Sequence, residues 1–298
     1  MIRVVTVRIL LTEKSAKAIK KSMSNLFEVE ITTTLGCPVR CSYCPQDQLL
    51  DTRGDRKRVL SYEDFIRAVD NIDFNVGLAW TGYSEPCLSP HLGKMLNYAK
   101  SKGFSQVIST TLTGKKESIH DAIIFDGWST FSFHLPDSHG LMTGLKVTTE
   151  YADLLDFAMS YRLEKLKQNQ NTRIICFGDD FHPLIKPIIY KYANKGLMPS
   201  RYIKLRGKVS SRSGGLNEDS LQNILRFLPD QEASPETPNS QYYYCNKFKL
   251  NQPCLLPDGS MNICSFDYGF RNVYGDLFTN KLSHIYNAWI SEISDQYL

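Results

Sequence analysis

The sequence predicts an α/β fold, a partial (β/α)6 barrel of parallel strands, and three observations support this prediction. Strand-like and helix-like segments alternate from residue 27 onward, which is typical of parallel α/β folds. The units number six, too few to close a complete barrel, so one side stays open. In such folds the functional loops follow the carboxyl ends of the strands. The expected strands are residues 27–34, 76–82, 106–112, 128–135, 172–178 and 201–207.

Helix signals fill the intervals between these strands. Ser61 is a typical N-cap with Asp64 three residues later, and Gly103 and Gly196 are typical residues just beyond a helix. The expected helices are residues 61–72, 90–102, 115–125, 149–169, 183–195 and 217–227.

A change of composition marks a boundary near the end of the barrel. Residues 229–241 are rich in Pro, Ser, Asn and Glu and read as a linker. Beyond it, an Asp258-Gly259 turn between apolar stretches predicts a hairpin, and residues 282–297 an amphipathic helix. We therefore expect an N-terminal extension (1–26), the barrel (27–228), the linker (229–241) and a small C-terminal domain (242–298).

Composition narrows the functional classes. The 298 residues are 42% hydrophobic and 22% charged, with a net charge of +4, too even for a dedicated nucleic-acid binder. No long uncharged apolar stretch predicts a membrane span, and residues 1–11 lack the features of a secretory signal. We expect a cytoplasmic protein without nucleic-acid or membrane partners. In a reducing compartment, its eight cysteines indicate metal or redox chemistry before disulfides.

Three cysteines form a compact motif directly after the first expected strand. Cys37, Cys41 and Cys44 have the spacing C-x3-C-x2-C. Three thiolates so close together suit one face of an iron–sulfur cluster and leave an iron atom without a protein ligand. A zinc site is the alternative. Zinc sites of this kind usually take a second pair of cysteines with the spacing C-x2-C, and the chain has no such pair outside the triplet.

This triplet, with the aromatic Tyr43 before its last cysteine, resembles the signature of the radical S-adenosylmethionine (SAM) superfamily. The resemblance implies that Cys37, Cys41 and Cys44 hold a [4Fe-4S] cluster whose open iron binds the amino and carboxylate groups of SAM. It also implies that one electron cleaves SAM to a 5′-deoxyadenosyl radical, which abstracts hydrogen from the substrate.

A second segment resembles the motif that binds the SAM amino group in that family. Residues 81–86 (TGYSEP) end the second expected strand, with Tyr83 and Ser84 where relatives often have glycine. Gly82 lets backbone carbonyls approach a ligand, and the Glu85 carboxylate suits an ammonium. By position in the family, further contacts to SAM or substrate are expected from Ser109, Thr111, His134 and, for the SAM carboxylate, Arg212.

The C-terminal cysteines resemble the opening of the auxiliary-cluster domains called SPASM and twitch. Cys245, Gly259 and Cys264 carry this likeness, but no cysteine follows Cys264, so the module is truncated and two auxiliary clusters are excluded. One cluster on Cys245, Cys254 and Cys264 is expected, with Asp267, solvent, substrate or Cys176 as fourth ligand. The alternative is that these cysteines are packed thiols. Cys87 and Cys176 are expected in the core, with a role as hydrogen donor as the catalytic alternative.

The sequence thus predicts a radical SAM enzyme that dehydrogenates or epimerises a small-molecule or saccharide substrate and is reduced by a partner such as flavodoxin or ferredoxin. Maturation of a ribosomally made peptide is the rival, weakened because only 36 residues precede Cys37, too few for a leader-recognition domain. A non-enzymatic iron–sulfur or zinc interaction module would leave Glu85 and the triplet at the strand ends unexplained.

Overall fold

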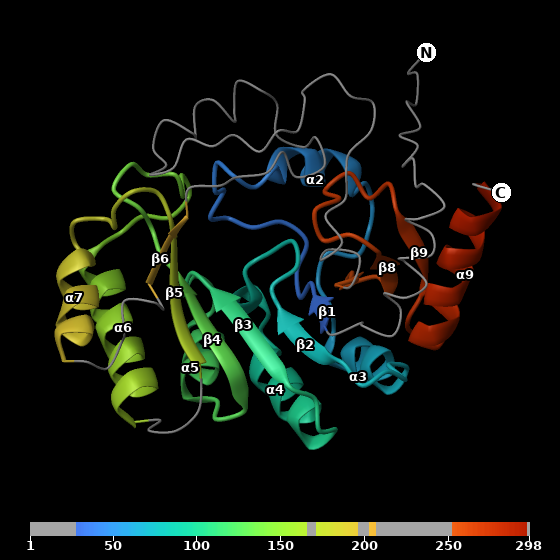
Figure 1. The fold of residues 1–298 in the computed structure, drawn as a ribbon, viewed down its shortest axis with the longest axis horizontal. Coiled ribbons are helices and arrows are strands. Elements are labelled where there is room, and N and C mark those ends of the chain that lie inside the picture. Colours follow the sequence, from blue (N-terminus) through green and yellow to red (C-terminus); the bar gives the residue numbers. More distant parts are fainter. Residues whose placement is uncertain (1–27, 166–170, 196–202, 207–251, 297–298) are drawn as a thin grey trace, which may run out of the picture.

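A computed structural model describes residues 28–165, 171–195, 203–206 and 252–296. Six parallel strands form a curved sheet, each hydrogen-bonded to the next along the chain (Figure 1). This confirms the expected α/β partial barrel. The strands are β1 (Glu28–Ile31), β2 (Gly77–Trp80), β3 (Gln106–Thr110), β4 (Trp128–His134), β5 (Asn171–Phe177) and β6 (Ile203–Arg206).

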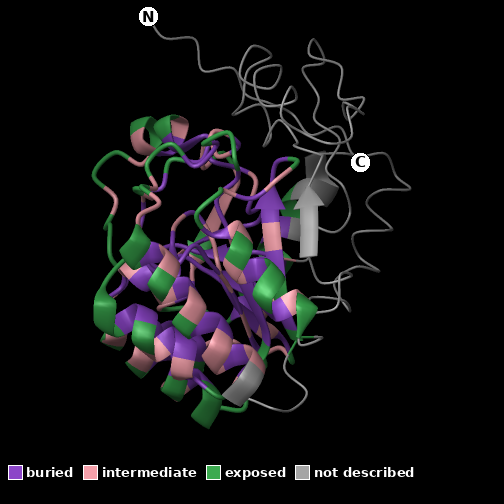
Figure 2. Cartoon of the chain, turned by 90° about the vertical axis from the view of Figure 1, so that its left-hand side faces the viewer, coloured by how far each residue is buried: buried purple, intermediate pink, exposed green. Residues whose placement is uncertain are grey.

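Helices cover the outer face of this sheet, and the core lies between the two layers (Figures 1 and 2). Ser61 caps the first of them, because its side chain accepts a hydrogen bond from the Asp64 amide at 3.1 Å. Gly103 ends another with a φ of 83°, a conformation that favours glycine. The helices are α3 (Tyr62–Asp70), α4 (Leu92–Ser101), α5 (Lys116–Ile124), α6 (Thr149–Ser160), which continues as the π-helical turn η3 (Tyr161–Lys165), and α7 (Lys186–Asn194).

The C-terminal hairpin extends the barrel sheet. Strand β7 (Cys254–Leu255) lies parallel to β1, and β8 (Ser260–Asn262) and β9 (Val273–Asp276) follow antiparallel. The resulting nine-stranded sheet has the order β6-β5-β4-β3-β2-β1-β7-β8-β9. The expected turn at Asp258-Gly259 and the closing helix, α9 (Leu282–Gln296), are both present, whereas β9 was not expected as a strand.

Two short elements near the strand ends were also not expected. Helix α2 (Gln46–Thr52) follows the cysteine triplet immediately, and a 3-10 turn, η2 (Pro86–Leu88), follows β2 with Glu85 as its N-cap. Each brings a polar side chain to the carboxyl ends of the strands: Gln46 begins α2, and Glu85 precedes η2. The expected helix 217–227 and the linker 229–241 lie outside the described residues, as do Arg212 and Cys245. No helix in the described ranges is long and apolar enough to cross a bilayer.

Candidate active site

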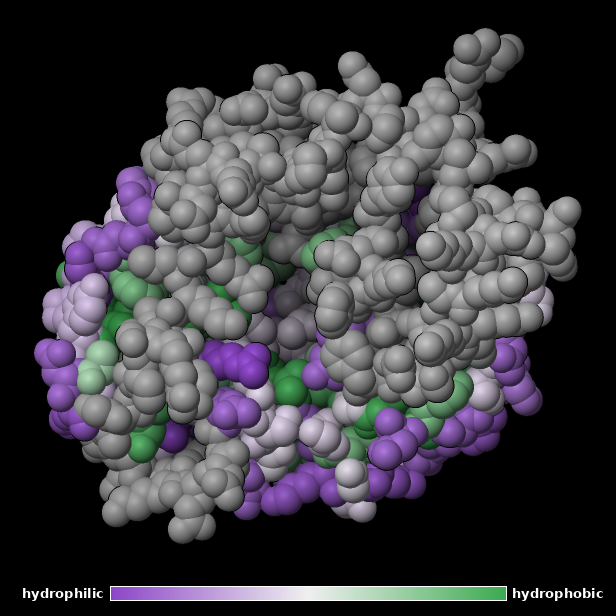
Figure 3. Space-filling view, viewed as in Figure 1, coloured by the Kyte–Doolittle hydropathy of each residue, from purple (hydrophilic) through white to green (hydrophobic). Residues whose placement is uncertain are grey.

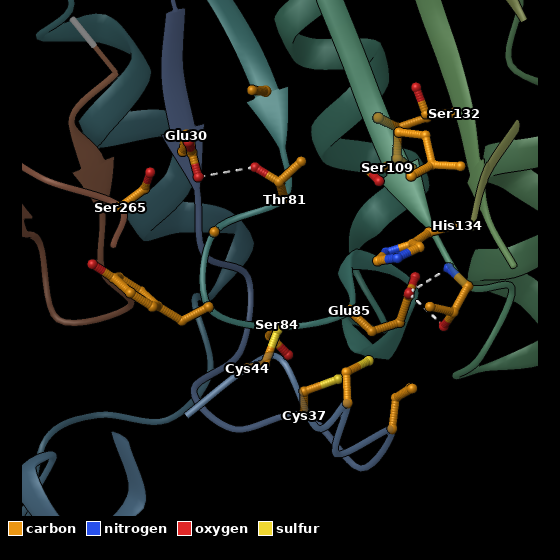
Figure 4. Close-up of a pocket in the computed structure, with 18 of the residues that line it drawn as sticks. Glu30, Cys37, Cys44, Thr81, Ser84, Glu85, Ser109, Ser132, His134 and Ser265 are labelled. Carbon is orange, nitrogen blue, oxygen red and sulfur yellow. Dashed lines mark hydrogen bonds between the residues drawn. The ribbon is translucent and has the colours of Figure 1, made fainter. Parts of the chain in front are cut away.

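A cavity of about 520 Å³ lies inside the curved sheet. Inward-facing residues of β1 to β5 form its wall, the cysteine loop lies at one end, and residues 265, 266 and 268 close one side. The face seen in Figure 3 is hollowed near its centre, and Figure 4 shows Cys37 and Cys44 at one end of the cavity and Glu30 toward the other. Many of the residues singled out from the sequence line it: Cys37, Cys41, Tyr43, Cys44, Gly82, Tyr83, Ser84, Glu85, Ser109, Thr111 and His134.

The cysteine loop is held by the loop that follows β4. The Ser42 amide donates to the Leu141 carbonyl at 2.7 Å, and the Gly144 amide donates to the Val39 carbonyl at 2.8 Å. A Cβ atom on Gly144 would lie 1.9 Å from the Pro38 carbonyl oxygen, so only glycine allows this approach. The position of the triplet therefore depends on a segment about a hundred residues away in the sequence.

Gln46 joins the cysteine loop to the loop after β2. Its Oε1 accepts the Cys37 amide at 3.0 Å, and its Nε2 donates to the Tyr83 carbonyl at 3.1 Å. The side chain is only 6% exposed. Gln46 thus fixes the two loops relative to each other, and sequence reasoning missed it because nothing in the triplet identifies its role.

The three thiols fit an iron–sulfur cluster by their chemistry. Burial raises the pKa of Cys37 to about 11, and a hydrogen bond with Cys44, together with burial, raises the pKa of Cys41. Cys37 and Cys41 are therefore protonated at neutral pH until a metal displaces the protons. Among the described residues, no three His, Cys, Asp or Glu side chains converge on a single metal ion. A four-iron cluster does not need that convergence, because each of its ligands binds a different iron atom.

Gly82 has a conformation that the next loop requires. Its φ is 63°, and a Cβ atom there would lie 2.3 Å from Thr32 Oγ1. Glycine therefore lets the loop pass against β1 at the edge of the cavity. Ser84 then donates a hydrogen bond to the Gly36 carbonyl at 3.0 Å, which ties this loop to the cysteine loop.

The Glu85 carboxylate is 3% exposed and accepts four hydrogen bonds from its own chain. Thr110 Oγ1 donates at 2.6 Å, the Thr111 amide and hydroxyl at 2.7 and 2.8 Å, and the Cys87 amide at 3.2 Å. Burial raises the pKa of Glu85, and these hydrogen bonds oppose that effect. In this structure the carboxylate holds the end of β3 against the loop after β2. Its role as the ammonium ligand stays a prediction.

Tyr43 and His134 meet on the cavity wall beside the cysteine loop. The Tyr43 hydroxyl lies 3.1 Å from His134 Nε2, and the Tyr43 ring stacks on Phe177 with centroids 4.2 Å apart. The structure thus brings together Tyr43, from the loop after β1, and His134, at the end of β4.

The two thiols considered as hydrogen donors do not line the cavity. Cys176 is buried in the main core, whereas its neighbours Ile175 and Phe177 face the cavity, as alternation along β5 requires. Cys87 is also buried in that core, with its sulfur 3.5 Å from Thr110 Oγ1. The structure thus places both thiols in core positions, as the sequence expectation stated.

Cys254 and Cys264 lie near each other around the Tyr83 phenol. The nearby charge of each thiolate contributes to the raised pKa of Tyr83, after burial as the largest cause. Cys254 Sγ lies 3.0 Å from Thr32 Oγ1. The Asp267 carboxylate accepts both the amide and the side-chain amide of Asn272, at 2.8 and 3.1 Å.

Solved structures share this architecture at low sequence identity. Streptococcus suis SuiB bound to precursor peptide SuiA has a TM-score of 0.53 and 15% identity, over 93% of this chain and 69% of SuiB. The enzyme anSMEcpe with bound AdoMet also has a TM-score of 0.53, at 12% identity over 89% of this chain and 82% of its own. This chain thus has the same fold as these two proteins, the fold expected from its sequence.

Two curated relatives, both biotin synthases, match part of this chain. Biotin synthase of Nitrosococcus oceani is 25% identical over 175 residues, which cover 55% of this chain and 48% of that protein. Biotin synthase of Xanthomonas campestris is 25% identical over 142 residues, covering 43% of this chain and 40% of that protein. The chain thus spans about half the length, or less, of these relatives. No family model matches it.

Proposed function

We propose that this protein is a radical SAM enzyme that cleaves SAM reductively and abstracts hydrogen from a substrate bound in the barrel. One observation carries the proposal: the cysteine triplet and the Gly82–Glu85 loop line the same cavity. The triplet and this loop are joined by Gln46 and by Ser84. A metal-binding interaction module would need no such cavity behind its cysteines.

Cys37, Cys41 and Cys44 would hold a [4Fe-4S] cluster, which when bound supplies the electron that cleaves SAM to a 5′-deoxyadenosyl radical. The backbone of the Gly82–Ser84 loop lies at the cavity edge, where its carbonyl groups would meet the amino end of SAM. Tyr43 and His134 form the adjoining wall. A partner such as flavodoxin or ferredoxin would supply the electron from outside, in the cytoplasm.

The substrate in this proposal is a small molecule or saccharide that undergoes dehydrogenation or epimerisation. Polar side chains on the inner face of the sheet support it, because Ser109, Thr130 and Ser132 all line the cavity. The alternative is modification of a ribosomally made peptide. The likeness to SuiB, whose structure contains a precursor peptide, keeps this alternative open.

The test is anaerobic reconstitution with iron and sulfide, followed by measurement of 5′-deoxyadenosine formed from SAM under reduction. We expect wild-type protein to form it and the variant with Cys37, Cys41 and Cys44 all replaced by Ala to form none. Cys176→Ala is the matched control, because that thiol lies in the core outside the cavity. Equal cleavage by the triple variant would refute the proposed function.

We propose separately that the C-terminal cysteines hold one auxiliary cluster. The nearness of Cys254 and Cys264 supports it, although Asp267 is engaged by Asn272 and Cys245 lies outside the described residues. With two four-iron clusters, wild type would contain about eight irons, and the variant lacking all three C-terminal cysteines about four. An iron content that does not change would contradict the auxiliary cluster and leave the first cluster untouched.

A further inference from the structure

Glu30 places a buried carboxylate on the cavity wall at β1. The residue is 7% exposed and faces the cavity together with Glu28, as alternation along the strand requires. Among the described residues, the one hydrogen bond to its carboxylate comes from Thr81 Oγ1, at 3.1 Å (Figure 4). Among the described residues, no Lys, Arg or His forms an ion pair with Glu30. A cationic partner stabilises a buried carboxylate, and a ligand in the cavity beside Glu30 can supply one.

The other carboxylates of the cavity have different surroundings. Glu28 accepts a hydrogen bond from Gln252 Nε2 at 2.8 Å, and Glu85 accepts four hydrogen bonds from its own chain. The cations Arg40 and Arg173 line the cavity but are exposed. Among the described residues, Glu30 therefore differs from both neighbours in having a single neutral donor, the Thr81 hydroxyl, beside its buried side chain.

Ser265 adds a polar side chain to the same wall of the cavity. Its side chain lines the same cavity from the segment between β8 and β9, and the residue is 6% exposed. Its Oγ is buried and has no hydrogen-bond partner among the residues that the structure describes. Ser265 is the one residue with such an unsatisfied atom, among those described, that also lines the cavity, where a ligand can supply the missing partner. Figure 4 shows Ser265 and Glu30 on the same side of the cavity.

Hydroxyl groups line the wall across from Glu30. Thr130 and Ser132 alternate inward along β4, and Ser109 is the register partner of Ser132 on β3. Neutral hydroxyls can both donate and accept, so they suit the remaining polar atoms of a ligand whose charged atom lies elsewhere.

We propose that Glu30, Thr81 and Ser265 form a subsite that binds a cationic amine of the substrate. An ammonium has three N–H donors, and this wall offers it a carboxylate and two hydroxyl oxygens. The inference rests on the proposed function, because it defines the substrate of that same cavity. The amine belongs either to an amino sugar or to a lysine side chain of a peptide, and the two sources share this chemistry.

The test measures binding by ligand-observed NMR titration of the reconstituted protein with SAM present. Two matched pairs of probes differ mainly in the charged amine: D-glucosamine with D-glucose, and Nα-acetyl-lysine amide with Nα-acetyl-norleucine amide. We expect the amine of one pair to bind about tenfold more tightly than its neutral partner, the range for a charge-assisted hydrogen bond. The pair that discriminates identifies the source of the amine.

Two variants locate the preference. Glu30→Gln keeps the shape of the side chain and should abolish the tenfold preference, and Ser265→Ala should reduce it severalfold. Glu28→Gln is the matched control on the same strand and should keep the preference, since Glu28 already has an amide partner. Thermal unfolding of each variant confirms that it is folded.

Three results would overturn the proposal. They are the absence of amine preference in both pairs, a preference that survives Glu30→Gln, and loss of SAM affinity in Glu30→Gln without change in the amine probes, which would assign the carboxylate to SAM. Formation of 5′-deoxyadenosine is measured in parallel. Its absence beside an intact amine preference would refute the radical chemistry and leave the subsite standing.

Discussion

Replacement of Gln46 by Leu tests whether one buried amide sets the geometry of the candidate active site. The substitution removes both the acceptor of the Cys37 amide at 3.0 Å and the donor to the Tyr83 carbonyl at 3.1 Å. The residue is 6% exposed, so water does not readily replace these partners. A buried polar group left without its partner costs about 1–3 kcal/mol. With partial relaxation of the loops, we expect Gln46→Leu to lower the free energy of unfolding by about 2–4 kcal/mol.

The free energy of unfolding is measured by urea titration of the metal-free protein under anaerobic, reducing conditions. A second assay follows the rate at which a chelator removes iron from the reconstituted protein, which we expect to rise because Cys37 is less firmly held. Gln48→Leu is the matched control, two residues further along α2. Its side-chain oxygen is buried and has no hydrogen-bond partner in the described ranges, so its removal should cost little.

Equal stability of the Gln46 and Gln48 variants, with equal rates of iron loss, would refute the reasoning. It would show that the two loops keep their arrangement through the other contacts, such as the hydrogen bond from Ser84 to the Gly36 carbonyl.

Three further predictions concern the same loops. Gly82→Ala should destabilise the protein more than Gly54→Ala, as measured by thermal unfolding, because both glycines have positive φ but only Gly82 would bring a Cβ atom within 2.3 Å of another atom. Tyr43→Phe should cost about 0.5–1.5 kcal/mol in urea unfolding, since it removes the 3.1 Å contact with His134 but keeps the stacked ring. Glu85→Gln should lower the free energy of unfolding by about 1–3 kcal/mol, because an amide nitrogen cannot accept the donors that now face the carboxylate. An unchanged unfolding midpoint would show that the hydrogen bonds of Glu85 do not stabilise the contact between the loop after β2 and the end of β3.

Much of the fold could be predicted because its signals are local. The alternation of apolar residues marked β1 to β6, Ser61 marked the start of α3, and Asp258-Gly259 marked the hairpin turn. The parallel pairing of β7 with β1 could not be predicted, because it joins residues more than two hundred positions apart and depends on hydrogen bonds that no local pattern encodes. That pairing makes the hairpin a continuation of the barrel sheet.

In the candidate site, too, some residues could be predicted from local sequence and others could not. The spacing of Cys37, Cys41 and Cys44 and the glycine before Tyr83 are sequence features whose chemistry can be read directly. The sequence alone did not reveal Gln46, because a glutamine in a helix has many uses. Glu30 did leave a signal, an acidic residue between Val29 and Ile31 in a strand of buried apolar residues, but its meaning depends on which face of that strand borders a cavity.

The sequence by itself determined the residue types and their order: three thiols after one strand, a glycine and a carboxylate after the next, and alternating apolar residues that place both at one end of a parallel sheet. Tertiary structure decided which polar atoms satisfy one another. Within the part of the chain that the structure describes, it gave Glu85 four donors and left Glu30 with one hydroxyl and Ser265 with none. The physical reason is that a buried charge or hydroxyl is defined by its neighbours, and these neighbours come from strands and loops distant in sequence.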